Sequence, residues 1–507
     1  MNTHHDTDRD GSPPEFPELV DTGIEGLDVV LGGGLPHNHA YLIQGRHGAG
    51  KTTLALQFLL AGARRGERGL YLATCESEEE IREVARSHGW HLDGDVVLHY
   101  HDPQESFGAE AQQSVFQPAE VELPRTMEAL REVIREVEPR RLVIDSLSEI
   151  RLLSPEGRRF RRQVLGLKED LRGRQCTTLF CDDHMAADQP VHSVVHGVID
   201  LEQLSPEYGS DRRRLRVAKL RGSTYVSGFH DFRILTGGIE VYPRLVAAEH
   251  RERGETGIMP SGRQKLDGLL GGGLDRGGAA LFLGPSGTGK STLATQFTEA
   301  AARRGERVAM YVFDERVQTL MARARGLGLE LEDQVKAGRV EVRQVDPAEL
   351  TPGEFSHGVR RAVSDRDVEL VVIDSLAGYF HAMPHERHLT LHLHELLAYL
   401  NEQGVTVIMV MNQHGLPGDN RHTPLDISYI ADTVLLFHSF EFAGELRKAL
   451  SVYKRREGPH EAMVRELGFG PDGIRIGEAL RNFRGITTGT PDYTGERLLG
   501  TPGEEGS

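Results

Sequence analysis

The chain has 507 residues, of which 38% are hydrophobic and 27% charged, a balance typical of globular domains and not of fibrous proteins. Its formal net charge of −17 argues against a protein whose main task is to wrap nucleic-acid backbones. No run of 18 or more apolar residues predicts a transmembrane helix, and the three cysteines, Cys75, Cys176 and Cys181, lack metal-ligand spacing. We therefore expect a cytoplasmic protein with no membrane partner and no disulfide framework.

The two ends of the chain differ in composition from the rest. Met1–Pro17 is polar, acidic and rich in His and Pro, and it lacks the basic start and apolar block of a signal peptide. Residues 492–507 are Gly-rich and acidic. We predict that both segments are disordered tails, because neither can bury enough apolar surface to fold.

Most of the remaining sequence is written twice. Leu27-Asp28, followed by Gly-Gly-Gly-Leu at 32–35, recurs as Leu266-Asp267, followed by the same segment at 271–274. Lys51 in one Gly-rich loop recurs 239 positions later as Lys290 in another. A period this long indicates a duplicated domain. The predicted domains are 18–244 and 245–491, with the linker placed in the charged, Gly- and Pro-containing stretch Pro243–Gly262.

Each copy alternates apolar strands with amphipathic helices. Leu142–Ile144 and Leu370–Ile373 are short, continuous apolar runs, which favours central parallel strands. Thr126–Glu138 places Leu130, Ile134 and neighbouring apolar residues on one helical face. This alternation predicts an α/β fold in which a parallel sheet is flanked by helices and ligands bind at the carboxyl ends of the strands.

A short apolar strand in each copy, Tyr41–Ile43 or Leu281–Leu283, leads into a Gly-rich loop that opens a helix. Such a loop curls backbone N–H groups around phosphates, and its lysine reaches the terminal phosphates. We therefore predict two sites for ATP, with Thr52 and Ser291 supplying hydroxyl groups to Mg²⁺. The expected ATP-binding residues are Gly45, Gly48, Gly50, Lys51, Thr52, Thr53, Gly284, Gly287, Thr288, Gly289, Lys290, Ser291 and Thr292.

Acids at further strand ends complete the expected sites. Asp145 and Asp374 each end a strand before Ser-Leu, the position of the second group that organises Mg²⁺, although an Asp there can instead cap a helix. Glu76 and Asp314-Glu315 follow the strand that comes after each Gly-rich loop and its helix, where a carboxylate can activate water or a hydroxyl beside the γ-phosphate. The alternative is a solvated helix start, which we prefer for Glu78–Glu80.

These features resemble the KaiC family of circadian clock ATPases, which have tandem RecA-like domains. The resemblance spans Val20 to Pro491 and includes Phe483–Ile486 and Thr488–Pro491. It implies a homohexamer of two rings with ATP clamped between neighbouring subunits. It also implies ATP hydrolysis chiefly in the first ring, and serine/threonine autokinase and autophosphatase activity in the second. In the family a regulator acts at the C-terminal end, but nothing in residues 492–507 names a partner.

The resemblance places basic residues that reach the neighbour's ATP on Lys219 and Arg221 in the first half and on Lys454 and Arg456 in the second. A cation supplied in trans offsets charge on the transferring phosphoryl group. The alternative interpretation of each Lys-x-Arg sequence is that it forms the outward-facing, charged edge of a strand. Arg212–Arg214 follows Gly-Ser, and we expect it in a solvated hairpin turn.

Two positions depart from the family pattern. The first-half carboxylate pair is reduced to Cys75-Glu76, so hydrolysis there is expected to be slow or to depend on Glu76. The second half keeps the pair as Asp314-Glu315, with an Asp where the family's expected base is one methylene longer. The family's adjacent phosphoacceptors fall on Ser428-Tyr429, which leaves Ser428 as the candidate acceptor, or as an ordinary serine, and brings a two-site cycle into question.

Three functions stay open on the sequence. The first is a KaiC-like hexameric ATPase and autokinase that serves as a signalling or timing switch. The second is a RecA- or RadA-like motor on nucleic acid, against which stand the net charge of −17 and the absence of a four-cysteine zinc module or a basic tail. The third is a nucleotide-gated scaffold with little turnover, which Cys75 favours for the first half.

Overall fold

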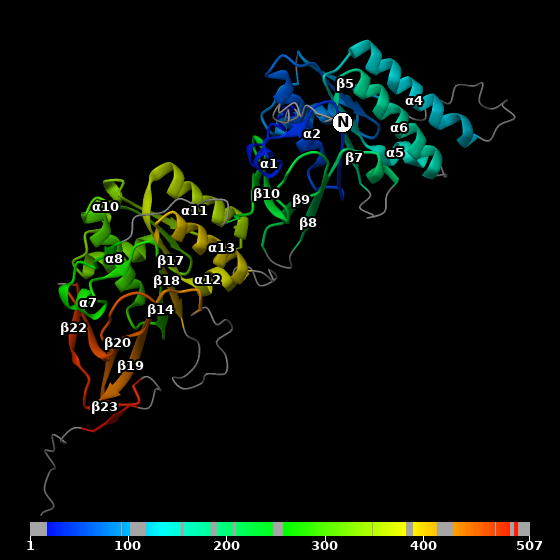
Figure 1. Cartoon of the computed structure of the whole chain (residues 1–507). Coiled ribbons are helices and arrows are strands. Elements are labelled where there is room, and N and C mark those ends of the chain that lie inside the picture. The colour runs from blue at the N-terminus through cyan, green and yellow to red at the C-terminus, as the bar shows by residue number, and fades with distance from the viewer. Residues whose placement is uncertain are drawn as a thin grey trace, which may run out of the picture. The chain divides into compact units, whose positions relative to one another are not determined.

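The computed structural model describes residues 18–92, 94–101, 118–153, 157–183, 190–205, 209–246, 257–346, 348–381, 389–412, 429–471, 473–486 and 491–494. The chain divides into two compact units, Met1–Arg244 and Leu245–Ser507, each of which is described by itself (Figure 1). No helix in the described part of the chain is long and apolar enough to span a membrane.

The described part of the first unit is built on a nine-stranded sheet. Its last six strands in spatial order are parallel, and an antiparallel meander of three strands extends one side. The order is β11 (Gly238–Tyr242), β10 (His230–Leu235), β9 (Arg212–Leu220), β8 (Gly197–Leu204), β3 (Ala40–Gly45), β7 (Thr177–Asp182), β6 (Arg141–Asp145), β4 (Gly69–Ala73) and β5 (Val96–Tyr100). A separate ribbon pairs β1 (Leu19–Val20) with β2 (Leu35–Pro36).

Helices cover both faces of this sheet (Figure 1). Alternate residues of β3 explain the two layers, because Tyr41 and Ile43 share a buried cluster with α2, whereas Ala40 and Leu42 share one with α4 and α6. The helices are α1 (Glu25–Val30), α2 (Lys51–Ala63), α3 (Glu78–Ser87), α4 (Pro118–Val137), α5 (Leu147–Leu152), α6 (Gly157–Gly173) and the 3-10 helix η2 (Pro190–Ser193).

The second unit repeats this plan. In the described residues its nine-stranded sheet has the order β16 (Val340–Gln344), β15 (Arg307–Val312), β17 (Val368–Asp374), β18 (Thr406–Asn412), β14 (Ala279–Gly284), β19 (Thr433–Phe442), β20 (Glu445–Arg455), β21 (Arg465–Gly470) and β22 (Gly473–Ala479). The helices are α7 (Gln264–Leu269), α8 (Lys290–Arg303), α9 (Val317–Gly326), α10 (Leu331–Lys336), α11 (Pro352–Arg366), α12 (Leu376–His381) and α13 (Leu389–Glu402). Short ribbons pair β12 (Ile258–Met259) with β13 (Leu274–Asp275), and β23 (Phe483–Arg484) with β24 (Asp492–Tyr493).

The α/β fold expected from the sequence is confirmed, including the four apolar strands named above. Three local expectations differ from the structure. The helix expected at Thr126–Glu138 begins eight residues earlier, at Pro118. Arg212–Arg214 was expected in a turn, which is wrong: these residues form the start of β9, paired with β8. Asp492 and Tyr493 form β24, because the Tyr493 ring packs against Phe442 and Phe483, whereas residues 1–17 and 495–507 lie outside the described residues.

The duplicated Leu-Asp and Gly-Gly-Gly segments have a structural role. Asp28 accepts hydrogen bonds from the backbone N–H and hydroxyl of Thr22, both at 2.8 Å, and Asp267 does the same with Ser261 at 2.7 and 2.6 Å. Gly34 has φ +135° and a side chain there would lie 2.4 Å from the carbonyl oxygen of Val20. These contacts lock the segment ahead of each loop strand, which explains why both copies keep the same residues.

Candidate functional site

The carboxyl ends of neighbouring parallel strands form a row in each unit. In the first unit, β3, β7, β6 and β4 lie side by side and are followed by the Gly-rich loop, Asp183, Asp145–Ser146 and Cys75-Glu76. In the second unit, β14, β18, β17 and β15 present the second loop, Asn412, Asp374–Ser375 and Asp314-Glu315. This edge is where parallel sheets bind ligands, and it gathers the loop residues and acids that the sequence singled out.

Both loops need glycine at the residue before the lysine. Gly50 and Gly289 have φ +101° and +102° and precede the first turns of α2 and α8. A Cβ on Gly50 would lie 2.9 Å from Ile234 Cδ1, and one on Gly289 would lie 2.0 Å from Phe469 Cζ. These left-handed residues turn the loop so that the helix starts at the lysine, and the N–H groups of its first turn are then suited to bind a phosphate.

Lys51 lies inside its loop, where its Nζ contacts three oxygen atoms. Its Nζ donates to the carbonyl oxygens of Gly45 at 2.8 Å and Arg46 at 3.2 Å. Nζ also lies 2.6 Å from Oδ1 of Asp183, at the end of β7. No sequence motif selects Asp183, and its one signal in the sequence is that it is an acid directly after an apolar strand.

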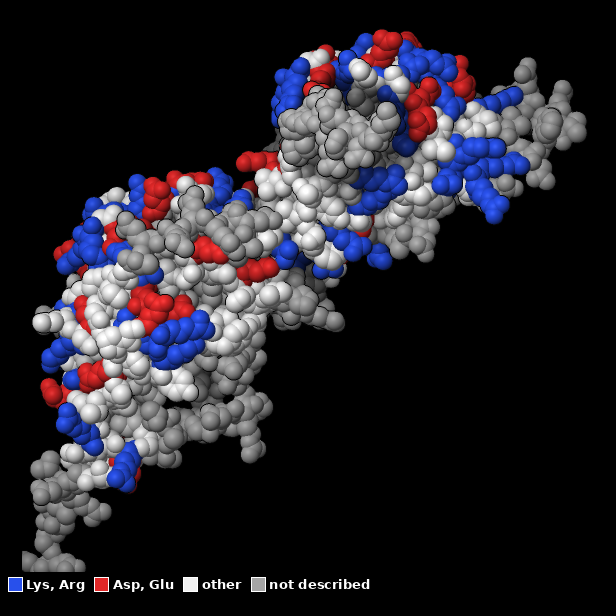
Figure 2. All heavy atoms as spheres, in the orientation of Figure 1, with Lys and Arg blue, Asp and Glu red and all other residues white. Residues whose placement is uncertain are grey.

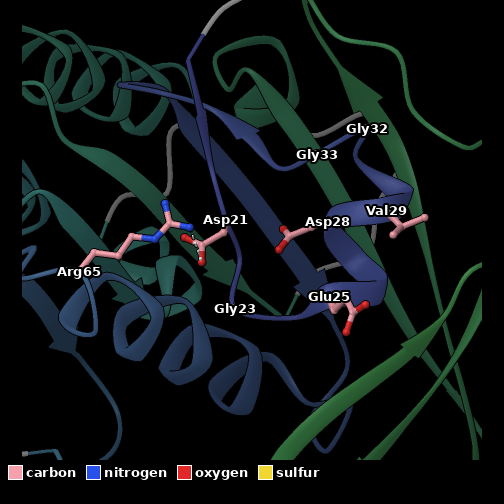
Figure 3. Close-up of a pocket in the computed structure, with 8 residues that line it drawn as sticks. All are labelled: Asp21, Gly23, Glu25, Asp28, Val29, Gly32, Gly33 and Arg65. Carbon is pink, nitrogen blue, oxygen red and sulfur yellow. Dashed lines mark ion pairs between the residues drawn. The ribbon is translucent and has the colours of Figure 1, made fainter. Parts of the chain in front are cut away.

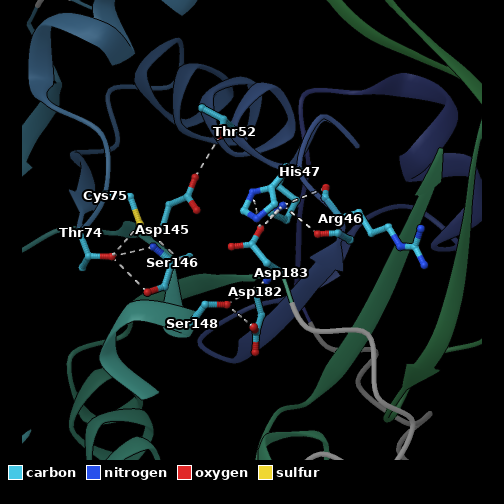
Figure 4. A network of polar contacts seen from close by, with 12 residues as sticks. Arg46, His47, Thr52, Thr74, Cys75, Asp145, Ser146, Ser148, Asp182 and Asp183 are labelled. Atoms are coloured by element: carbon cyan, nitrogen blue, oxygen red, sulfur yellow. Dashed lines mark hydrogen bonds and ion pairs between the residues drawn. The ribbon is translucent and has the colours of Figure 1, made fainter. Parts of the chain in front are cut away.

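Thr52 and Asp145 are brought together as expected for a shared metal. The Thr52 hydroxyl donates to Oδ2 of Asp145 at 3.1 Å (Figure 4). The same oxygen accepts from the Tyr71 hydroxyl at 2.6 Å. Burial raises the pKa of Asp145, whereas the hydrogen bond from Tyr71 and the charge of Lys51 lower it. One hydroxyl and one carboxylate fit Mg²⁺, which proteins commonly hold through one or two carboxylates and the phosphates of the substrate. Among the described residues, no group of three or more His, Cys, Asp or Glu could hold a metal by itself.

The next strand end carries the departure from the family. The Cys75 thiol lies 4.0 Å from the Ser146 hydroxyl and 3.9 Å from that of Thr74 (Figure 4). Partial burial raises the pKa of this thiol above its usual 9.0, so it is neutral near pH 7 and poorly suited to accept a proton from water. Burial and the charge of Asp145 raise the pKa of Glu76, while Lys51 lowers it. Glu78–Glu80 form the first turn of α3 with a Ser77–Glu80 capping box, as expected.

In the second loop, the lysine is bound by backbone carbonyl oxygens, and an asparagine takes the place of the carboxylate that contacts Lys51. Lys290 Nζ donates to the carbonyl oxygens of Gly284 at 2.8 Å and Pro285 at 2.6 Å, and the Thr288 hydroxyl donates to Pro285 at 2.8 Å. Burial lowers the pKa of Lys290 to about 8, although the charge of Asp374 raises it. Asn412 occupies the position of Asp183. Gly284 pairs with Asn412 in the strand register, and Gln44 pairs with Asp182, so the next residue, Asp183, is level with Gly45, the counterpart of Gly284.

The acids of the second site are individually restrained. Burial raises the pKa of Asp374, and a hydrogen bond from Ser291 lowers it. The Ser375 hydroxyl donates to Oδ2 of Asp314 at 2.5 Å. Arg323 Nη1 lies 2.7 Å from each carboxylate oxygen of Glu315. Arg323 is a second residue that sequence reasoning missed. It lies on α9, the helix that follows Glu315, and the first unit has Val84 at the matching position, so the internal repeat does not indicate it.

The low pKa of Lys290 predicts a pH-dependent affinity for ATP at the second site. Phosphate binding favours the charged amine, so a proton is taken up on binding and the affinity should fall about fivefold from pH 8 to pH 9. A fluorescent ATP analogue titrated into a Lys51→Met variant would measure this dependence at the second site. The same chain with Lys290→Arg should show a flat profile, because guanidinium stays charged. A flat profile with lysine in place would contradict this assignment.

The four basic residues expected to act in trans lie towards the amino ends of the strands, away from the loop of their own unit. Lys219 pairs with Val198, which pairs with Leu42 of β3. Its backbone is therefore separated from Gly45 by about 10 Å along the strands and about 10 Å across them. Lys219 Nζ donates to the carbonyl oxygens of His192 and Val195, at 2.5 and 2.7 Å. Burial and Arg221 lower the pKa of Lys219.

The second unit has the same geometry at this end. Lys454 pairs with Val434 and its Nζ donates to the Ala431 carbonyl at 2.7 Å. Arg456 donates to Oδ1 of Asp432 at 3.0 Å and to the carbonyl of Tyr429 at 2.7 Å. Arg221 makes the matching contact with the Ser193 carbonyl at 3.4 Å. Ser428, the candidate phosphoacceptor, lies outside the described residues, but its chain neighbour Tyr429 is held at this end of the sheet.

A hollow of about 680 Å³ in the first unit lies elsewhere. Figure 3 shows Asp21, Glu25 and Asp28 around it, with Arg65 paired to Asp21. Arg65 follows the last turn of α2, whereas Lys51 opens that helix, so about 20 Å of helix separates the hollow from the loop lysine. Burial raises the pKa of Asp28 to about 6, but its hydrogen bonds to Thr22 already explain its place. The hollow is therefore separate from the candidate nucleotide site.

Comparison with known proteins agrees with this geometry. The family model "ATPase: KaiC" matches residues 20–246 and again residues 259–481. The chain is 27% identical to Circadian clock oscillator protein KaiC 1 of Synechocystis over 96% of this chain and 94% of that protein. It is 28% identical to Circadian clock protein KaiC3 of the same organism, over 95% and 97%, and 28% identical to Circadian clock oscillator protein KaiC of Thermostichus vulcanus, over 93% and 91%.

Proposed function

The chain belongs to the KaiC family of ATPases, and on that premise we propose that it is a hexameric ATPase whose nucleotide sites are completed by neighbouring subunits. Its second domain would act as a serine autokinase on Ser428, and the assembly would serve as a signalling or timing switch. The relatives that match nearly the whole chain are named circadian clock proteins, which supports the proposed role.

One observation carries the proposal of shared sites. In both units the lysine and arginine expected to contact the γ-phosphate lie towards the opposite strand ends from the loop that binds it. A single subunit cannot easily use both sets on one ATP. In a closed ring of head-to-tail subunits, the amino-end surface of one copy meets the carboxyl-end surface of the next, which would unite them.

In this arrangement each residue has a defined proposed role. Lys51 and Lys290 would bind the terminal phosphates, and the loop N–H groups from Gly45 to Thr53 and from Gly284 to Thr292 would surround the phosphate chain. Thr52 with Asp145, and Ser291 with Asp374, would hold Mg²⁺, whose charge offsets that of the phosphates. Lys219, Arg221, Lys454 and Arg456 would stabilise charge on the phosphoryl group supplied by the neighbour.

The second unit is the better candidate for phosphoryl transfer to protein. It keeps Asp314 and Glu315, and Arg456 fixes the backbone at Tyr429, next to Ser428. Because Tyr429 lies with the trans residues, the proposed transfer runs from the ATP of one subunit to Ser428 of the adjacent one. Glu315 or Asp314 would accept the hydroxyl proton while the serine oxygen bonds to the γ-phosphorus and the bond to the β–γ bridging oxygen breaks with its electrons on ADP.

A motor on nucleic acid is the weaker alternative. Basic and acidic side chains are interspersed over the described surfaces visible in Figure 2, with both signs on each unit. Together with the net charge of −17, this favours solubility over backbone binding. Stimulation of ATP hydrolysis by single-stranded DNA at modest salt, by tenfold or more, would support the motor and contradict the proposal.

The test of the proposal combines assembly with labelling. Light scattering after size-exclusion chromatography should give a hexamer with ATP and Mg²⁺ and a smaller species without ATP. Incubation with γ-labelled ATP should label the chain, and Ser428→Ala should remove most of the label while leaving the hexamer intact. Ser439→Ala, in strand β19, is the matched serine control and should keep the label. Equal labelling of the Ser428→Ala chain would contradict the kinase assignment.

A further inference from the structure

Asp183 is an acid in the first site that no motif accounts for. It follows β7, the strand between loop strand β3 and the Asp145 strand β6. Its Oδ1 lies 2.6 Å from Lys51 Nζ and 3.7 Å from His47 Nδ1, and its side chain is 24% exposed. Beyond the effect of burial, the charge of Asp183 raises the pKa values of Glu76 and Asp145, and the charge of Lys51 lowers both.

The backbone under Asp183 is held in place. Asp182 is fully buried, and one of its carboxylate oxygens accepts from the Ser148 hydroxyl (Figure 4). The other carboxylate oxygen accepts from Arg151. The Ser148 oxygen in turn accepts from the Asp183 backbone N–H at 3.1 Å. The carboxylate of Asp183 is therefore presented to the loop from a supported strand end, as a catalytic group requires.

The two units distribute their acids differently. The first has Cys75 on the β4 side and Asp183 on the β7 side, whereas the second has Asp314 at the position of Cys75 and Asn412 at that of Asp183. Of these two positions, each site thus has an acid at only one. In the first unit this acid lies on the β7 side of β6, whereas in the second it lies on the β15 side of β17, which is the opposite side. The Cys75 thiol, whose pKa is raised, does not provide a carboxylate's function.

We propose that Asp183 is a catalytic carboxylate of the first site and orients and deprotonates the attacking water in place of the missing acid at Cys75. This rests on the proposed ATPase function. With ATP bound, Lys51 would turn to the γ-phosphate, which leaves Asp183 beside the reacting phosphoryl group. The water oxygen bonds to the γ-phosphorus, the bond to the β–γ bridging oxygen breaks with its electrons on ADP, and the water proton passes to Asp183 and then to the released phosphate.

The test uses the full chain carrying Lys290→Met, so that turnover reports the first site. Asp183→Asn, which copies Asn412, should lower kcat about tenfold or more while ATP binds equally well or more tightly. Cys75→Glu should restore much of this loss in the Asp183→Asn chain, and Asp183→Glu should keep measurable turnover. Asp170→Asn, an exposed acid on α6 of the same unit, is the matched control and should not change kcat.

The outcomes separate this inference from the proposed function. If Asp183→Asn binds ATP and turns it over at the parent rate or faster, Asp183 only occupies Lys51 in the free protein, and the catalytic role is overturned. Loss of ATP binding in both Asp183 variants would show a structural role and would also overturn it. If the Lys290→Met parent hydrolyses no ATP although it binds the nucleotide, the proposed hydrolysis in the first unit fails together with the role of Asp183.

Discussion

Replacing Lys454 by alanine should lower ATP turnover and phosphoryl transfer in the second unit about 100-fold or more, because a cation supplied to the transferring phosphoryl group is among the largest contributions to such reactions. ATP binding should change less, since the second loop and Lys290 stay in place. Steady-state hydrolysis and labelling with γ-labelled ATP, in a Lys51→Met background, would measure both effects. Lys336→Ala, an exposed lysine on α10, is the matched control and should leave turnover unchanged.

The decisive form of this experiment mixes two inactive chains. Subunits with Lys454→Ala keep an intact loop, and subunits with Lys290→Met keep an intact Lys454. If each site is shared, rings assembled from both chains contain some interfaces with an intact loop on one side and Lys454 on the other, so activity should reappear. Activity that does not return in mixed hexamers, shown to be mixed by differently tagged chains, would place Lys454 in the site of its own subunit or outside it.

Replacing Lys290 by methionine should abolish labelling of Ser428 and lower turnover in the second unit about 100-fold or more. Lys290 is 4% exposed and its Nζ is bound by two loop carbonyl oxygens, so it places one positive charge where the γ-phosphate is expected. Methionine fills similar space without the charge. The measurement is label incorporation in the full chain, with assembly checked by light scattering.

Lys51→Met is the informative control for that experiment. It removes the equivalent charge from the first loop, so it should lower hydrolysis by the first unit but preserve labelling wherever the hexamer still forms. Loss of label in an intact Lys51→Met hexamer would show that phosphoryl transfer to Ser428 does not belong to the second site alone. Label that survives in Lys290→Met would contradict the assignment of the second loop.

The sequence by itself determined the duplicated α/β fold and the two loops. Apolar runs of strand length, each followed by a Gly-rich turn and a helix, leave one arrangement in which the lysine opens the helix, and both copies adopt it. The positions of Asp145 and Asp374 could also be predicted, because an acid at the carboxyl end of a buried parallel strand must lie at the ligand-binding edge of the sheet. These features depend on local periodicity and on the order of strand, loop and helix, which the chain encodes over short distances.

Only the tertiary structure decided which distant residues share a site. Asp183 lies 132 positions after Lys51 and meets it because β7 is inserted beside β3 in the sheet. Arg212–Arg214 join a strand because β9 pairs with β8 from Arg212 onward. Strand order and register follow from packing of the whole sheet, so no local pattern specifies them. The separation of Lys219 and Lys454 from their own loops, on which the proposed sharing of sites between subunits depends, is likewise a property of that packing.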